Sequence, residues 1–205
     1  VGSFFEIGRL YGTGTITGLA RLAGQPVGVL GNDCRQLAGA MTATGAQKTR
    51  RFIEFCDTFH LPIVNLIDEP GFMIGVDAEK IGTIRFGTAA VIAAASSVVP
   101  WASVIVRKLH GVAQAANFGP DGFVVAWPSA EIAVMGPEGA VNIIHRAEIA
   151  AAGDDIEQVR FKLLQEYREG ISNPYVSAER GFLDDVIDPA ETRAMLVKSL
   201  ELLKG

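Results

Sequence analysis

Apolar and polar residues follow two different periods along the first third of the chain. Ile16–Arg21 and Pro26–Leu30 are short strand-like runs, and Ala23–Gln25 between them is typical of a turn. Gly45–His60 carries apolar residues at helical spacing, with basic residues on another face. Pro62–Ile67 is a mainly apolar run, as in a strand that is buried on both faces. The pattern predicts two strands, a helix and a buried strand, in that order.

The alternation of helix and strand continues through the rest of the chain. A helix is predicted over Glu79–Ser97 and a strand over Trp101–Val106, followed by a glycine-containing turn and a short helix. Three further strands are predicted at Phe123–Ala126, Glu131–Val134 and Leu183–Ile187. Three further helices are predicted: one that begins at Gly136, one over Ile156–Glu169 and one from Asp188 to about Lys204. The last helix has a favourable start, with Asp at the N-cap, proline at the first position and Glu at the third.

Strands that alternate with helices indicate a single α/β domain over residues 1–205, with a mainly parallel sheet and right-handed crossovers. Ligands of such folds bind beyond the carboxyl ends of the strands. Two glycine-containing turns, Pro70–Gly75 and Gly111–Ala113, follow predicted strands at this edge. Each turn places backbone N–H groups near the start of a helix, where negative charge is favoured.

Composition narrows the class of protein further. The 205 residues are 49% hydrophobic, enough for a sizeable core, and the net charge of −5 is spread without runs. This argues against nucleic acid or an anionic membrane as the main partner. The two cysteines, Cys34 and Cys56, have no ligand spacing, which predicts buried thiols in a reducing, cytoplasmic compartment. The first residues show no signal peptide, and the start at Val1 is typical of a piece cut from a longer protein.

One stretch is long enough to span a bilayer. Phe86–Val106 contains no charged residue. Pro100 divides it into an alanine-rich part and a short β-type run. A tightly packed helix followed by a buried strand is therefore the preferred interpretation, and no membrane association is expected.

Six sequence blocks resemble one known family, in the right order and over nearly the whole chain. The blocks are Ile16–Gly28, Gly45–Ile53, Cys56–Phe72, Val104–Ala113, Trp127–Ala140 and Ala178–Arg193. Trp127–Ala140, which reads WPSAEIAVMGPEGA, is similar almost letter for letter. The family is the carboxyltransferase of propionyl-CoA and related acyl-CoA carboxylases, including the carboxyltransferase subunits of biotin-dependent decarboxylases.

The resemblance implies a crotonase-like spiral of βαβ units and a specific division of labour. Residues 1–205 would be the C-terminal half of the usual polypeptide, which receives carboxybiotin, while the N-terminal half, absent from this chain, binds most of the acyl-CoA. The active site of the family lies between the N-terminal half of one subunit and the C-terminal half of another. The implied partners are therefore biotin carboxylase with its biotin carrier protein, the N-terminal carboxyltransferase half and further copies in a homo-oligomer.

The reaction implied by the resemblance moves CO2 from N1 of biotin to the α-carbon of an acyl-CoA thioester. Negative charge develops on the biotin ureido oxygen and on the thioester oxygen, and backbone N–H donors that are already in place stabilise such oxyanions. By resemblance, these donors in this half are the amides of Val112 and Ala113, which would stabilise the biotin enolate. The enolate itself acts as the base, so neither a catalytic His, Asp or Glu nor a metal is required.

Other pocket residues follow from the same resemblance. Gly71, Phe72 and Gly111 would face biotin or the acyl chain, and Ala115 would line the acyl pocket. The chain departs from the family at two positions. It has Val112 where a second glycine is common, which keeps the N–H but restricts the backbone, and it has His110 where Tyr or Phe is usual.

Side chains alone suggest no strong catalytic constellation. His60, His110 and His145 share no metal-ligand spacing. Ser96, Ser97 and Ser129 lack the surroundings of a nucleophilic serine. Asp68 and Glu69 could form an acid/base pair. The alternative is that Asp68 caps the turn and Glu69 has no part in it, since adjacent side chains usually point apart.

Three alternatives to a carboxylase remain open from the sequence. The first is a subunit of a biotin-dependent Na⁺-pumping decarboxylase, which uses similar chemistry in reverse. The second is a crotonase-type hydratase or a Clp-like peptidase, which would need paired carboxylates or a Ser–His pair. The third is a catalytically silent half that serves as a scaffold or docks the biotin carrier. The sequence does not specify the acyl group.

Overall fold

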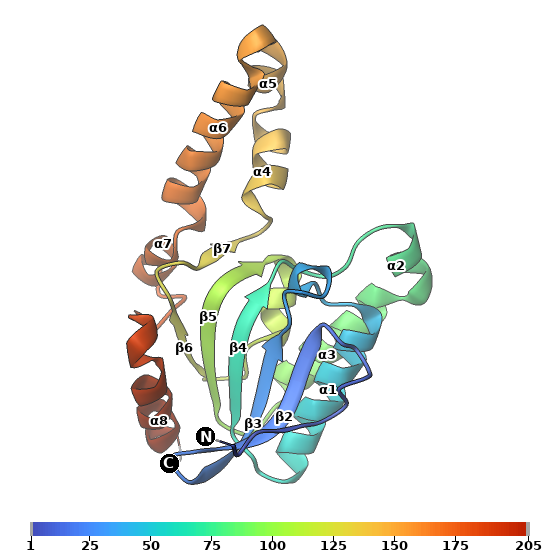
Figure 1. The fold of residues 1–205 in the computed structure, drawn as a ribbon, viewed down its shortest axis with the longest axis vertical. Coiled ribbons are helices and arrows are strands. Elements are labelled where there is room, and N and C mark those ends of the chain that lie inside the picture. The colour runs from blue at the N-terminus through green and yellow to red at the C-terminus, as the bar shows by residue number, and fades with distance from the viewer. Residues whose placement is uncertain (1, 204–205) are drawn as a thin grey trace.

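The computed structural model describes residues 2–203 as one α/β domain built on an eight-stranded sheet (Figure 1). The strands are β1 (Phe5–Glu6), β2 (Thr15–Leu22), β3 (Gln25–Asn32), β4 (Ile63–Glu69), β5 (Trp101–His110), β6 (Phe123–Ala126), β7 (Glu131–Ala133) and β8 (Asp185–Val186). Their order is β1-β2-β3-β4-β5-β6-β8, with β7 paired to the end of β5. β1, β2 and β3 pair antiparallel and all later pairs are parallel, so the predicted mainly parallel sheet is confirmed.

Helices cover the two faces of the sheet. They are α1 (Ala43–Thr58), α2 (Val76–Ile81), α3 (Thr83–Ala95), α4 (Pro137–Ile144), α5 (Arg146–Ala151), α6 (Ile156–Tyr167), α7 (Pro174–Glu179) and α8 (Thr192–Leu202). Short 3-10 turns are η1 (Leu37–Gly39), η2 (Gly111–Ala116), η3 (Gly153–Asp155) and η5 (Pro189–Glu191), and η4 (Arg168–Ser172) is a π turn. Figure 1 shows α1 and α3 together on one side of the strands and α8 on the other.

The core follows from the period of two in β4. Ile63 is fully buried and packs with Phe52 of α1 and with Trp101. The next residue, Val64, faces the opposite side of the sheet and packs with Leu196 of α8. Successive side chains of a strand point to opposite faces, so an apolar run such as β4 can hold both helical layers.

The structure corrects three predicted boundaries. The helix expected over Glu79–Ser97 is two helices, because Gly82 adopts a left-handed conformation (φ 84°) that ends α2 before α3 begins. The strand expected to end at Val106 continues to His110, since Lys108–His110 pair with β7. The final helix ends at Leu202, and Lys204 lies outside the described residues.

The uncharged stretch of residues 86–106 divides as predicted into a helix and a strand. It comprises most of α3 and the first part of β5. Within residues 2–203, no helix has the length and apolar character needed to cross a membrane.

A helical arm projects beyond the carboxyl ends of the strands, where Figure 1 shows α4, α5 and α6 extending away from the sheet. The arm has its own small core, formed by Ala133, Ala140, Val141, Ile149, Leu163 and Tyr167. Ile143, Ile144 and Phe161 lie on the arm with more than half of their surface exposed. The sequence predicted helices here but not their projection from the domain.

Candidate active site

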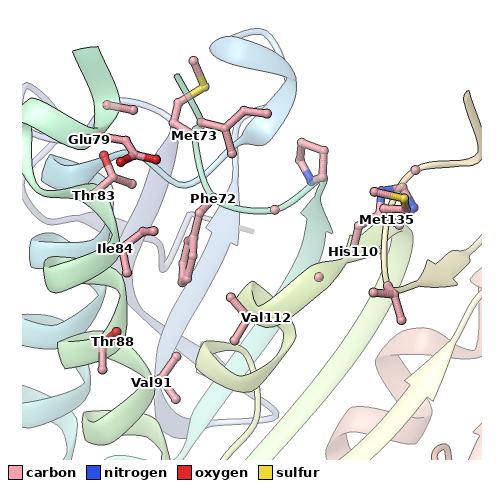
Figure 2. Close-up of a pocket in the computed structure, with 17 residues that line it drawn as sticks. Phe72, Met73, Glu79, Thr83, Ile84, Thr88, Val91, His110, Val112 and Met135 are labelled. Carbon is pink, nitrogen blue, oxygen red and sulfur yellow. The ribbon is translucent and has the colours of Figure 1, made fainter. Parts of the chain in front are cut away.

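A pocket of about 570 Å³ lies at the carboxyl ends of β4 and β5 (Figure 2). One wall is the segment Pro70–Phe72 after β4, called the PGF turn below. Another wall is the start of the η2 turn, where Gly111 and Val112 follow β5. Residues of α2 and α3, the segment Val134–Gly136, and Met73, Ile74 and His110 complete the lining. The two glycine-containing turns singled out in the sequence therefore meet at one cavity.

The PGF turn is held in place by backbone contacts. Gly71 has φ 119°, a conformation that side-chain-bearing residues rarely adopt. Its carbonyl accepts a hydrogen bond from the amide of Met41 (3.0 Å), and the amide of Met73 donates to the carbonyl of Met41 (2.9 Å). These bonds on both sides of Phe72 fix the direction in which its ring leaves the backbone.

Phe72 lies against a helical glycine. A β-carbon added at Gly87 of α3 would stand 2.7 Å from Cζ of Phe72. Figure 2 shows the ring of Phe72 between α3 and Val112. The missing side chain at position 87 thus leaves the space that the ring occupies.

The η2 turn begins with a glycine for a similar reason. Gly111 has φ 69°, and a β-carbon there would lie 3.3 Å from the carbonyl oxygen of Val134. Val112 follows with two thirds of its surface (67%) exposed at the pocket, while Ala113 is fully buried behind it. Ala115 is exposed but is not one of the residues that line the pocket.

The two amides at the start of η2 differ in the acceptors available to them within the protein. The first amides of a helical turn have no partner in the preceding turn. Among the hydrogen bonds of residues 2–203, neither Val112 nor Ala113 donates to a loop, turn or cap carbonyl. In a 3-10 turn, however, the carbonyl of His110 is the natural acceptor for Ala113. The amide of Val112, one residue earlier and at the pocket wall, is therefore the better-placed donor.

The Gln114 side chain ties η2 to two strands. Its Nε2 donates to the carbonyl of Ala133 on β7 (2.9 Å) and to that of Leu109 on β5 (3.3 Å). The turn is thus attached both to the strand that precedes it and to the segment that forms the opposite wall of the pocket.

The adjacent acids Asp68 and Glu69 point apart. The carboxylate of Asp68 contacts Lys108 Nζ (2.5 Å) and Arg107 Nε (3.1 Å) and accepts a hydrogen bond from Cys34 Sγ (2.7 Å). Burial pulls the pKa of Asp68 up, but hydrogen bonds from Cys34 and Lys108 outweigh it and leave the pKa below its usual value. Asp68 therefore belongs to an ion-paired cluster outside the pocket and does not form an acid/base pair with Glu69.

Glu69 is fully buried directly before the PGF turn. Burial raises its pKa to about 8, against the opposing effects of the neighbouring Asn117 and Asn32 side chains. Its Oε2 accepts a hydrogen bond from Asn117 Nδ2 (2.9 Å), 48 residues away in the sequence. The sequence indicated Glu69 only as a candidate acid/base partner of Asp68, because nothing in the local pattern distinguishes a buried acid from one at an exposed turn.

His110 is the histidine at the pocket. It is 4% exposed, and its Nε2 has no hydrogen-bond partner among the described residues. Burial lowers its pKa, opposed by the nearby carboxylate of Glu131. In the described part of the chain, no group of three His, Cys, Asp or Glu side chains is arranged to hold a metal ion. Glu79 is the one carboxylate among the described pocket residues, and no serine lines the pocket.

Comparison with known proteins gives a consistent match to one family. The profile of the carboxyl transferase domain family matches residues 1–205. The carboxyltransferase subunit of propionyl-CoA carboxylase from Haloferax mediterranei is 44% identical over 208 residues, which cover 100% of this chain and 40% of that protein. The α subunit of methylmalonyl-CoA decarboxylase from Veillonella parvula is 40% identical over 98% of this chain and 38% of its own length.

Solved structures agree with the sequence relatives. A crystal structure of the transcarboxylase 12S hexamer with methylmalonyl-coenzyme A and methylmalonic acid bound has a TM-score of 0.91 and 42% identity, and the match covers 98% of this chain and 39% of that one. The β subunit of geranyl-CoA carboxylase from P. aeruginosa has a TM-score of 0.84 at 26% identity, with 98% and 38% covered. The chain thus spans about two fifths of the length of its relatives.

Proposed function

Because this chain belongs to the carboxyl transferase domain family, we propose that it is the carboxybiotin-binding half of a biotin-dependent acyl-CoA carboxyltransferase. The observation that carries the proposal is the pocket at the ends of β4 and β5, where Gly71, Phe72, Gly111 and Val112 meet. In this proposal, residues 1–205 are the C-terminal half, and the half that binds most of the acyl-CoA lies elsewhere in the parent protein.

The pocket fits a small ring system that carries one anionic oxygen. Its walls are mostly apolar, with Phe72, Ile84 and Val112 among them, and apolar walls around a few polar groups are typical of ligand sites. Carboxybiotin supplies the CO2 to be transferred, and negative charge develops on its ureido oxygen as the N–C bond breaks. The amide of Val112, assisted by that of Ala113, donates to this oxygen.

In this proposal, the chain contributes to catalysis through two N–H dipoles of fixed orientation, those of Val112 and Ala113. Donors that are already oriented need not rotate during the reaction, which is the main source of their catalytic effect. The φ of Gly111 and the hydrogen bonds of Gln114 hold the η2 turn in this orientation. Buried His110 and exposed Ala115 have no assigned step, although Ala115 remains a predicted contact of the acyl group.

The direction of transfer and the partners also belong to the proposal. The Veillonella relative is a decarboxylase subunit with nearly the same identity as the carboxylase subunits, so a decarboxylase remains the second candidate. The expected partners are a biotin carrier protein with its biotin carboxylase, the missing half and further copies of the chain. A cytoplasmic location and the lack of a catalytic metal stay predictions.

The proposal is tested by deleting one amide donor at a time. The host is a complete carboxyltransferase that contains this chain, assayed by transfer from methylmalonyl-CoA to free biocytin. Val112→Pro and Ala113→Pro each remove one N–H and should lower kcat by about 10²–10³-fold, the usual effect of one lost oxyanion donor. Val112→Ala and Ala113→Ser keep the N–H and should be far milder.

Proline can also distort the turn, so thermal unfolding must show that each variant is folded. Folded proline variants that both transfer the carboxyl group at near wild-type rates would overturn the assignment of these amides. Biocytin binding to the inactive variants would separate loss of catalysis from loss of the site.

A further inference from the structure

A buried hydrogen-bond network underlies the two turns of the pocket. Asn117 caps the carboxyl end of η2, and its Nδ2 donates to Oε2 of Glu69 (2.9 Å) and to the carbonyl of Ala113 (2.9 Å). Asn65 Nδ2 donates to Oδ1 of Asn117 (2.9 Å). The side chains of Glu69 and Asn65 both belong to β4 and are fully buried.

The network joins elements that both line the pocket. Glu69 is the last residue of β4 and directly precedes the PGF turn. Asn117 is held from a second strand as well, because Ser103 Oγ of β5 donates to its carbonyl (3.1 Å). The Glu69–Asn117 hydrogen bond thus links the end of β4, next to the PGF turn, to the carboxyl end of η2.

We propose that Glu69 and Asn117 are positioning residues, and that Glu69 in its neutral form holds Asn117 against Ala113 and so fixes the amide donors of η2 relative to the PGF turn. This inference rests on the proposed function, in which those amides stabilise the developing negative charge. Neither residue lines the pocket, so both act through the backbone of the turn.

Burial favours the neutral form of Glu69. Its Oε1 has no hydrogen-bond partner among the described residues, and neither has Oδ1 of Asn65. An ionised carboxylate at this place would accept a hydrogen bond from Asn117, with the side-chain amide of Asn32 nearby, and would still be costly to bury. Its negative charge would also oppose the negative charge that the nearby amides are meant to stabilise.

The charged groups near Glu69 do not change this conclusion. Asp68, on the other face of β4, is already paired with Arg107 and Lys108 of β5. Residues 111–116 of η2 carry no charged side chain, and β3 contributes the neutral Asn32. His110, at the end of β5, has its pKa lowered by burial, which disfavours its charged form. No described cation therefore pairs with Glu69.

The inference is tested with Glu69→Gln, which keeps the shape of the side chain and cannot ionise. The host and the methylmalonyl-CoA to biocytin assay are those described above, run between pH 6 and pH 10. Wild-type kcat should fall as pH rises through the pKa of Glu69, which lies near 8, and should level off about tenfold lower, the size expected for one lost positioning hydrogen bond. Glu69→Gln should lose this alkaline decline and stay within about threefold of the wild-type kcat at pH 7. Glu54→Gln, at an exposed position of α1, is the matched control and should keep the decline.

Asn117→Leu tests the other half of the pair. It removes three side-chain hydrogen bonds, with Glu69, Ala113 and Asn65. It should lower kcat at least about tenfold at pH 7, while KM for methylmalonyl-CoA changes less than threefold. A structural defect alone would instead lower the amount of folded enzyme, measured by active-site titration. An alkaline decline that persists unchanged in Glu69→Gln would overturn the inference.

The stability of the protein gives an independent check. The pKa of Glu69 is higher in the folded protein than in the unfolded chain. Between pH 4.5 and about 8 the unfolded chain therefore loses this proton while the folded protein keeps it, and the free energy of unfolding should fall as the pH rises through this range. Glu69→Gln should flatten this slope. If the folded Val112→Pro and Ala113→Pro enzymes were fully active, the assignment of these amides as oxyanion donors in the proposed function would fail. If they were inactive but Glu69→Gln kept the wild-type profile, only this inference would fail.

Discussion

Replacing Gly87 by alanine should drive the ring of Phe72 out of its place beside α3. The new β-carbon would lie 2.7, 2.9 and 3.1 Å from three carbons of the ring, whereas carbon atoms in contact are normally about 3.5–4.0 Å apart. The ring must therefore retreat by roughly 1 Å. Because Phe72 is held by the backbone bonds of the PGF turn, the retreat leads toward Val112 and narrows the pocket.

Two opposing effects set the stability of the Gly87→Ala protein. Overpacking of this kind costs about 1–3 kcal/mol, whereas alanine in place of glycine inside a helix gains about 1 kcal/mol. The net loss should be about 0–2 kcal/mol, and each kcal/mol should lower Tm by about 2–4 °C in a domain of this size. Gly139→Ala in α4 is the matched control. A β-carbon there meets no atom within 4 Å, so it should stabilise by about 1 kcal/mol.

A double-mutant cycle with Phe72→Ala isolates the contact. Without the ring, Gly87→Ala should become stabilising by about 1 kcal/mol, which gives a coupling free energy of about 1–3 kcal/mol. Urea unfolding of the four proteins, with the slope m compared across them, measures each value. Effects that add to within about 0.5 kcal/mol would refute the reasoning, because the ring would then not depend on the empty position.

Three further outcomes are expected. Gly119→Ala should destabilise by about 3 kcal/mol in urea unfolding, since its β-carbon would lie 2.2 Å from the fully buried Trp101 ring; a smaller change than about 0.5 kcal/mol would contradict this packing. Iodoacetamide at pH 7 should alkylate Cys34 slowly, because burial and the hydrogen bond to Asp68 raise the pKa of its thiol, and Cys56, whose pKa burial raises to about 12, should react only after unfolding. The purified 205-residue chain alone should self-associate in sedimentation, because apolar side chains are exposed on its arm, and should not carboxylate propionyl-CoA, because positioning of the second reactant is missing.

The hydrophobic pattern alone predicted the order and type of most of the long elements, although β1, α5 and α7 were not predicted. Hydrophobic periodicity is local, so α1, β4 and β6 could be located from a few residues each. The place of the pocket also followed, because the carboxyl ends of parallel strands share one edge and glycines mark the turns that follow them. The family resemblance then indicated which turns matter, and the comparisons support that family.

The tertiary structure was needed for every feature that depends on contacts between residues far apart in the sequence. A sequence cannot show that Glu69 and Asn117, 48 positions apart, share a hydrogen bond, because that requires knowing how β4 and η2 pack. The position of Phe72 against Gly87 and the extra length of β5 depend likewise on neighbours that only folding provides. Burial is the common physical reason. It raises the pKa of Glu69, and it leaves room for the Phe72 ring only because Gly87 has no side chain. Burial depends on the whole fold and cannot be determined from the neighbouring sequence.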